Sequence, residues 1–219
     1  MTLTRARVEA VIFDCDGTLV DSEPLARAAW EGSLAPHGYG IDDAEYAGLI
    51  GLPYLRVHGF FAERIPGLEG PDAFWEAYAA RLFDLIDAEL EPFADALATV
   101  RGVAARGVAV AVASSSPRAR LDRTLARAGL ADAFAVTVAG DEVAHGKPAP
   151  DMFLAAAGRL GVEPARCAVI EDSAPGVAAG LAAGMTTVGI ARSAADAEPL
   201  AGAHVVLREL TARAVLAAG

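Results

Sequence analysis

Two aspartates, Asp14 and Asp16, stand two residues apart within the segment Asp14–Thr18. The segment directly follows Val8–Phe13, an apolar run rich in β-branched residues that predicts a buried parallel strand. Two carboxylates at the end of a buried strand are costly in free energy unless a positive charge lies between them. Because open α/β sheets bind ligands at the carboxyl ends of their strands, the pair indicates a site for a divalent cation and a phosphoryl group.

Lys147 is the only lysine of the chain, since 17 of the 18 basic residues are arginines. It stands in the segment Gly146-Lys147-Pro148. An ammonium group is a compact charge with three donors on a flexible stem, whereas a guanidinium is a broad planar fork. In a chain that otherwise uses arginine, this lysine indicates a tight site beside carboxylates and a phosphate, where only the smaller cation has room.

Strand-like runs alternate with amphipathic helical patterns over most of the chain. The predicted strands are Val8–Phe13, Val108–Ala113, Ala135–Ala139, Ala168–Ile170, Thr186–Ile190 and His204–Leu207. The predicted helices between them are Ala94–Arg106, Arg118–Ala128, Pro150–Leu160 and Pro175–Ala183. A glycine follows each of these helices, as is typical of helix C-termini. The alternation predicts an α/β protein with a Rossmann-like parallel sheet and helices on both faces.

The stretch 21–91 interrupts this alternation, because it contains helical patterns and no convincing strand. The helices that we predict there are Pro24–Ala35, Asp43–Leu49, Leu55–Arg64 and Pro71–Leu90. The stretch is too long for a loop of a compact domain. We therefore predict an all-α domain, 21–91, inserted into a core domain made of 1–20 and 92–219. The inserted stretch holds both tryptophans and all four tyrosines, most of which we expect in its own core.

Residues that could do chemistry follow several of the predicted strands. They are Asp14, Asp16, Ser114, Lys147 and the pair Glu171-Asp172. In a parallel sheet the carboxyl ends of the strands meet at one edge, so we expect these side chains to converge. This convergence disfavours the simpler interpretation, in which the two aspartates are only turn residues that end a strand.

In these segments the chain resembles the haloacid dehalogenase-like superfamily of phosphohydrolases, over essentially its whole length. The segments that carry the resemblance are Asp14–Ser22, Ala113–Ser116, Gly146–Asp151 and Val169–Ser173. The helical insertion resembles the small cap domain of that superfamily. The most similar branch contains sugar phosphatases, 6-phosphogluconate phosphatase among them, phosphoglycolate phosphatases and β-phosphoglucomutases.

The resemblance implies a Mg²⁺-dependent phosphatase that hydrolyses a small phosphorylated metabolite, a sugar or sugar-acid phosphate, through an aspartyl-phosphate. Asp14 would be the nucleophile, and Asp16 the general acid and base. The residues implied as metal ligands are Asp14, Asp16 through its carbonyl, Asp172 and Glu171, the last either as a direct ligand or as a support for the others. The residues implied in phosphate binding are Ser114, Ser115 and Lys147. Weaker candidates for substrate contacts are Gly51, Tyr54 and Arg118.

A β-phosphoglucomutase-like phosphomutase is the main alternative. Those mutases carry an arginine three residues after a glycine in a loop of the cap. Aligning that glycine with Gly51 puts Tyr54 at the position, and the inserted stretch contains no lysine, which favours hydrolysis. Arg56, Arg64 or Arg81 could nevertheless supply the missing charge.

A phospho-receiver domain that acts as a switch, rather than as an enzyme, is a more distant alternative. Such a domain also phosphorylates an aspartate at a strand end, but its acidic pair follows the first strand and its phospho-acceptor lies on a later strand. In this chain the candidate phospho-acceptor itself follows the first strand, the second acidic pair comes late, and a helical insertion lies between them. Dehalogenation is disfavoured because Asp16 would be superfluous for it. A dinucleotide-binding module is disfavoured because no Gly-x-Gly-x-x-Gly follows the first strand.

Composition excludes further classes of function. The net charge of −11 disfavours a nucleic-acid partner, whose phosphates require clustered lysines and arginines. No apolar run reaches the length of a membrane span, and the N-terminus lacks a signal-peptide pattern. Cys15 and Cys167 make no disulfide framework, so we expect buried thiols in a reducing compartment. These observations predict a cytoplasmic protein, monomeric and without a membrane partner.

Overall fold

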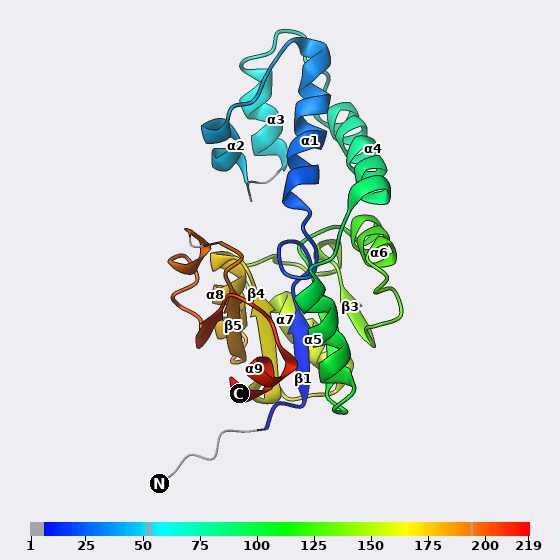
Figure 1. Cartoon of the computed structure of the whole chain (residues 1–219). Coiled ribbons are helices and arrows are strands. Elements are labelled where there is room, and N and C mark those ends of the chain that lie inside the picture. Colours follow the sequence, from blue (N-terminus) through cyan, green and yellow to red (C-terminus); the bar gives the residue numbers. More distant parts are fainter. Residues whose placement is uncertain (1–6, 51, 53, 194) are drawn as a thin grey trace. The chain divides into compact units, whose positions relative to one another are not determined.

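The chain forms two compact units in the computed structural model, which describes residues 7–50, 52, 54–193 and 195–219 (Figure 1). The first unit, here called the core unit, comprises Met1–Asp21 and Glu91–Gly219. The second, the helical unit, is Ser22–Leu90. We describe each unit by itself.

One parallel sheet organises the core unit. Among the described residues its strands are β1 (Ala10–Phe13), β2 (Ala109–Ala113), β3 (Val136–Val138), β4 (Cys167–Glu171), β5 (Thr186–Ile190) and β6 (Val205–Leu207). Their order in the sheet is β3-β2-β1-β4-β5-β6, which is the doubly wound order of nucleotide-binding folds. Strand β1 pairs with β2 and with β4, so it is central and buried at all of its residues. The predicted Rossmann-like α/β class is therefore confirmed.

Helices cover both faces of this sheet (Figure 1). In the core unit they are α5 (Ala94–Ala104), α6 (Arg118–Arg127), α7 (Asp151–Leu160), α8 (Ala174–Ala182) and α9 (Ala212–Ala217), with short 3-10 turns η2 (Gly140–Glu142), η3 (Pro164–Arg166) and η4 (Ala195–Ala197). Helices α7 and α8 pack on one face, while α5 packs against β2 and against α9. The short helix α9 was missed in the sequence; it begins where the Thr211 hydroxyl accepts a hydrogen bond from the Ala214 amide.

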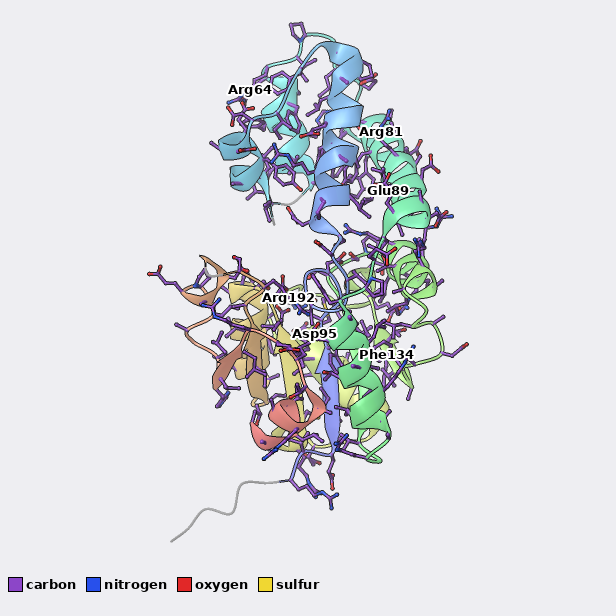
Figure 2. All side chains as sticks on the ribbon, in the orientation of Figure 1. Arg64, Arg81, Glu89, Asp95, Phe134 and Arg192 are labelled. Atoms are coloured by element: carbon purple, nitrogen blue, oxygen red, sulfur yellow. The ribbon has the colours of Figure 1, made fainter. Side chains whose placement is uncertain are left out.

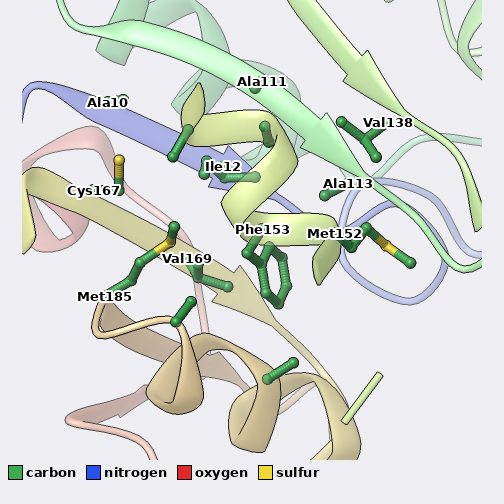
Figure 3. Packing of buried hydrophobic residues seen from close by; sticks show 14 residues of the cluster. Ala10, Ile12, Ala111, Ala113, Val138, Met152, Phe153, Cys167, Val169 and Met185 are labelled. Atoms are coloured by element: carbon green, nitrogen blue, oxygen red, sulfur yellow. The ribbon is translucent and has the colours of Figure 1, made fainter. Parts of the chain in front are cut away.

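The sheet face that α7 covers carries an apolar layer of buried side chains (Figure 3). Phe153 and Met152 of α7 are fully buried, together with Ile12 of β1 and Val169 of β4. Full burial of side chains of this size stabilises a fold by about 1.5–3 kcal/mol each. This packing makes β1 and β4 a rigid platform for the polar residues at their carboxyl ends.

Arg192, just after β5, braces the loop that follows β1 (Figure 2). Its guanidinium lies 2.7 Å from a carboxylate oxygen of Asp95 and donates to the Thr18 carbonyl at 2.8 Å. Asp95 also accepts a hydrogen bond from the Leu210 amide at 2.8 Å. Burial acts to raise the pKa of Asp95, but the Leu210 amide and Arg192 outweigh it and hold that pKa below its ordinary value. The carboxylate therefore stays charged, and its contacts connect α5 with the segments that contain Arg192 and Leu210.

The helical unit is a small bundle with an aromatic interior. Its helices are α1 (Glu23–Leu34), α2 (Asp43–Leu49), α3 (Tyr54–Ala62) and α4 (Pro71–Glu89), with the 3-10 turn η1 (Ala35–His37) after α1. The Trp30 ring stacks on Tyr78 with centroids 4.1 Å apart and lies near Phe61 and Phe74. Over the described part of the chain, no helix combines the length and the apolar character that crossing a membrane requires.

Candidate active site

The carboxyl end of the sheet brings Lys147 against two buried carboxylates. The Lys147 Nζ lies 2.5 Å from Asp14 Oδ1 and 2.6 Å from Glu171 Oε1, and it donates to the Ala113 carbonyl at 3.2 Å. The side chains of Lys147, Asp14 and Glu171 are 6%, 9% and 1% exposed. The ammonium therefore donates hydrogen bonds to Asp14 and to the Ala113 carbonyl, and it forms an ion pair with Glu171 inside a closed site.

Lys147 stays positively charged in this environment. Burial acts to lower the pKa of Lys147, but the charges of Asp14 and Glu171, with their hydrogen bonds, outweigh it and raise that pKa above its ordinary value. Burial raises the pKa of Asp14 well above its ordinary value, an effect that Lys147 opposes and that Glu171 and Asp172 reinforce. Burial also raises the pKa of Asp172 to about 7, with the charge of Glu171 adding to it. The site holds more negative charge than one lysine balances.

Three carboxylates of this group could share one metal ion. Asp14, Glu171 and Asp172 each offer an oxygen, and these oxygens lie within 4.8 Å of one another. Carboxylate oxygens are the ligands that Mg²⁺ prefers, and a divalent cation would relieve the crowding of negative charge. The residues present therefore fit such an ion.

The Asp16 carboxylate is held by two donors of its own. Its Oδ1 accepts a hydrogen bond from Arg120 Nη2 at 2.8 Å, and its Oδ2 accepts one from Ser116 Oγ at 2.8 Å. The sequence interpretation missed Arg120, because a helical pattern does not reveal which residues of α6 face a distant loop. A signal for Ser116 was its place in the serine run after β2.

The loop after β2 places its serines differently. Ser114 is buried; its amide donates to the Val138 carbonyl, and its hydroxyl accepts from the Ser116 amide at 3.1 Å. Ser115 is exposed. A Cβ on Gly140 would lie 2.2 Å from the Ser115 carbonyl oxygen, so glycine is needed there for the close approach of the two loops.

The weaker substrate-binding candidates are Arg118, Tyr54 and Gly51. Arg118 forms hydrogen bonds with Asp122, Glu142 and Thr137. Tyr54 lies in the helical unit with its ring 4.6 Å from that of Trp75, and its hydroxyl has no hydrogen-bond partner among the described residues. Gly51 lies outside the described residues. The part of each in substrate binding stays a prediction.

Two glycines make room for the acidic pair after β4. Gly17 has a φ of +79°, and a Cβ there would lie 2.0 Å from Asp172 Oδ2. Gly176 of α8 lies against Glu171, so that a Cβ would be 1.8 Å from its carboxyl carbon. Glu171 Oε2 also accepts hydrogen bonds from the amide and hydroxyl of Ser173, at 2.9 and 2.8 Å. The positions of both carboxylates therefore depend on residues without side chains.

Gly176→Ala is expected to reduce activity at least about 10-fold, because the added methyl group must displace the Glu171 carboxylate from Lys147. Overpacking of this kind also destabilises a fold by about 1–3 kcal/mol. Steady-state phosphate release and thermal unfolding measure the two effects. Gly158→Ala is the matched control, since nothing lies within 4 Å of its added Cβ. Equal activity of the two variants would contradict the prediction.

Comparison with known proteins supports the chemistry indicated by this geometry. The family model for haloacid dehalogenase-like hydrolases matches residues 8–184. The chain is 37% identical to fructose-1-phosphate phosphatase YqaB of Escherichia coli over 84% of its own length and 97% of that protein. It is 33% identical to hexitol phosphatase B of Escherichia coli, over 97% of its length and 99% of that protein.

A solved structure extends the similarity to the whole fold. A candidate β-phosphoglucomutase from Thermotoga maritima superposes with a TM-score of 0.82 at 28% identity. The superposition covers 96% of this chain and 97% of that one.

Proposed function

We propose that this chain, which belongs to the haloacid dehalogenase-like hydrolase family, hydrolyses sugar phosphates in a Mg²⁺-dependent reaction. The chain is a phosphoric monoester hydrolase by that membership and by its phosphatase relatives. The observation that carries the proposal is the buried contact of Asp14 with Lys147, beside Glu171 and Asp172. The sugar part of the proposal rests on the names of the two relatives, which act on a ketose phosphate and on hexitol phosphates.

In the proposed reaction, the Asp14 carboxylate attacks phosphorus and the bond from phosphorus to the sugar oxygen breaks. Asp16 gives its proton to the leaving oxygen and the product is a sugar plus an aspartyl-phosphate on Asp14. Asp16 then takes a proton from water, whose oxygen attacks phosphorus, so that phosphate leaves and the Asp14 carboxylate returns.

Lys147 and the loop after β2 are proposed to stabilise the negative charge that develops on the phosphoryl oxygens. Lys147 lies 2.5 Å from Asp14, so its charge is next to the atom that forms the new bond. Ser114 and Ser115 are proposed to hold the phosphoryl oxygens. Mg²⁺ would be held by Asp14, Glu171, Asp172 and the Asp16 carbonyl. Its positive charge would offset the negative charge of the phosphoryl group.

A panel of phosphorylated metabolites, assayed with Mg²⁺ for phosphate release, tests the proposal. Fructose 1-phosphate and hexitol phosphates should rank among the best substrates. No release from any member would contradict a phosphatase. An aspartyl-phosphate that forms and does not turn over would instead favour a receiver switch.

A mutase is the second candidate, favoured by the similarity to the Thermotoga maritima structure. The same assay separates the two, because a mutase forms a doubly phosphorylated hexose and interconverts sugar phosphates. We expect free phosphate and no bisphosphate.

Removal of Mg²⁺ with excess chelator is expected to abolish turnover, because the carboxylates of Asp14, Glu171 and Asp172 crowd one edge of the sheet, where Lys147 contacts only two of them. Mg²⁺ at about 100 times its dissociation constant should also stabilise the fold by about 2.7 kcal/mol. Thermal unfolding with and without the ion measures this shift.

Two variants serve as controls for the metal prediction. Asp172→Asn should show a smaller thermal shift with Mg²⁺ than the wild type, because one of the grouped oxygens is changed. Asp132→Asn, an exposed position outside the group, should show the same shift as the wild type. Full activity in excess chelator would contradict the predicted requirement for Mg²⁺.

A further inference from the structure

We propose that Arg120 is a positioning residue that holds the carboxylate of Asp16 in place for proton transfer. The proposal rests on the proposed function, because it takes Asp16 as the group that protonates the leaving oxygen. Arg120 belongs to α6, and neither the sequence motifs nor the metal group includes it.

The geometry fixes the Asp16 carboxylate at both oxygens. Arg120 Nη2 binds Oδ1 from helix α6, and Ser116 Oγ binds Oδ2 from the loop after β2, each at 2.8 Å. The last torsion of an aspartate is otherwise broad, with no strongly preferred value. Two donors from different elements, one on each oxygen, confine that torsion. A carboxylate oxygen accepts about two hydrogen bonds, so each oxygen keeps capacity for a proton.

The carboxylate of Asp16 depends on such hydrogen bonds for its position more than the carboxylate of Asp14 does. The Asp14 side chain is 9% exposed and is held by Lys147, whereas the Asp16 side chain is 30% exposed and lies outside the group of Asp14, Glu171 and Asp172. Packing alone therefore restrains Asp16 less. A misplacement of about 1 Å of a group that takes part in the reaction can cost about 10²-fold in rate.

Helix α6 does not depend on Arg120 alone for its attachment to the fold. The Arg120 side chain is 21% exposed and that of Asp16 is 30% exposed, so loss of this ion pair should cost less stability than loss of a fully buried pair. Helix α6 is anchored by the buried side chains of Leu121 and Leu125, and at its first residue by Arg118. Loss of the Arg120 guanidinium should therefore leave α6 in place and release Asp16.

The test compares two leaving groups in Arg120→Gln. A sugar alkoxide must be protonated as it leaves, whereas p-nitrophenolate is a stable anion and leaves without a proton. The kcat/KM for each substrate reports the steps through the first phosphoryl transfer. Because a proton-transfer group contributes about 10²–10⁴-fold, we expect kcat/KM to fall at least about 10-fold more for the best sugar phosphate than for p-nitrophenyl phosphate.

Further variants calibrate this selectivity. Asp16→Asn should show the same preference for p-nitrophenyl phosphate to a greater degree, and Arg120→Lys should recover part of the loss on the sugar phosphate. Ser116→Ala, which removes the other donor, should shift the ratio in the same direction. Arg127→Gln is the matched control on the same helix, because Arg127 forms an ion pair with Glu91; its ratio should equal that of the wild type.

Equal losses on both substrates in Arg120→Gln would overturn the proposal, since they point to a contact with the phosphoryl group or to damage to the fold. Unchanged kcat/KM on both would overturn it as well. Thermal unfolding of Arg120→Gln is expected close to that of the wild type. A wild-type protein that hydrolyses neither substrate would contradict the proposed function itself, which is a different result from an unchanged ratio in an active enzyme.

Discussion

Asp14→Asn is expected to abolish turnover, because an amide oxygen is too weak a nucleophile to attack phosphorus. Loss of the nucleophile in other covalent enzymes costs up to about 10⁶-fold in kcat, so the residual rate should be far below a tenth of the wild type. The measurement is phosphate release from the best substrate of the panel. A variant that keeps more than about a tenth of the rate would remove Asp14 from the role of nucleophile.

The same variant should remain folded. Asparagine has nearly the shape of aspartate, and the substitution removes one of the carboxylates that crowd Glu171 and Asp172. Burial already disfavours the charged form of Asp14, since it raises the pKa of that carboxyl. Thermal unfolding of the metal-free variant is therefore expected at or above the wild-type midpoint. Trapping of phosphate on the wild type, and on Asp14→Asn in parallel, locates the covalent intermediate.

The class of the fold was readable from the sequence because its signals are local. Buried strands such as Val8–Phe13 appear as apolar β-branched runs, and the runs at 108–113, 135–139 and 168–170 are each followed by an amphipathic helix. Chain alternation of this kind leaves few topologies other than a parallel sheet. The structure also brings Asp14, Lys147 and Glu171 together, as the rule for strand ends predicts.

Contacts that depend on the orientation of a helix face could not be predicted from the sequence. Arg120 stands 104 residues after Asp16, and four arginines of α6 offer the same chemistry. Which of them reaches the loop after β1 is decided by the packing of α6 on the sheet. Gly176 gave no signal either, because the space for Glu171 is a property of the packed α8 and β4, not of a motif. The short helix α9 has too few residues for a periodic pattern.

Lys147→Arg is expected to be nearly as damaging as Lys147→Ala, although it keeps the positive charge. The Nζ lies 2.5, 2.6 and 3.2 Å from oxygens of Asp14, Glu171 and Ala113, so oxygens of three different segments surround the ammonium. With a side chain only 6% exposed, the site has no space for a planar guanidinium unless Asp14 or Glu171 moves. A displacement of about 1 Å can cost about 10²-fold, and phosphate release by both variants should fall at least that far.

Stability has to be measured beside activity for these variants. Lys147→Ala leaves the buried carboxylates of Asp14 and Glu171 without their partner, and breaking a buried pair costs about 3–5 kcal/mol. Since whole domains are stable by only about 5–15 kcal/mol, the assays belong at a temperature well below the unfolding midpoint of each variant. Arg159→Lys is the reverse exchange at a partly exposed pair with Glu142, and it should keep wild-type activity and stability.

The comparison of Lys147→Arg with Lys147→Ala separates charge from shape. If charge alone mattered, the arginine variant would keep near-wild-type activity while the alanine variant lost it, and the geometric argument would be wrong. If shape matters as well, both variants fall together although only one of them has lost a charge. The second result is expected, because the chain uses arginine at all 17 of its other Lys or Arg positions, which implies that arginine was accessible here too. A single ammonium in a chain of guanidinium groups is then explained by the size of the space between Asp14 and Glu171.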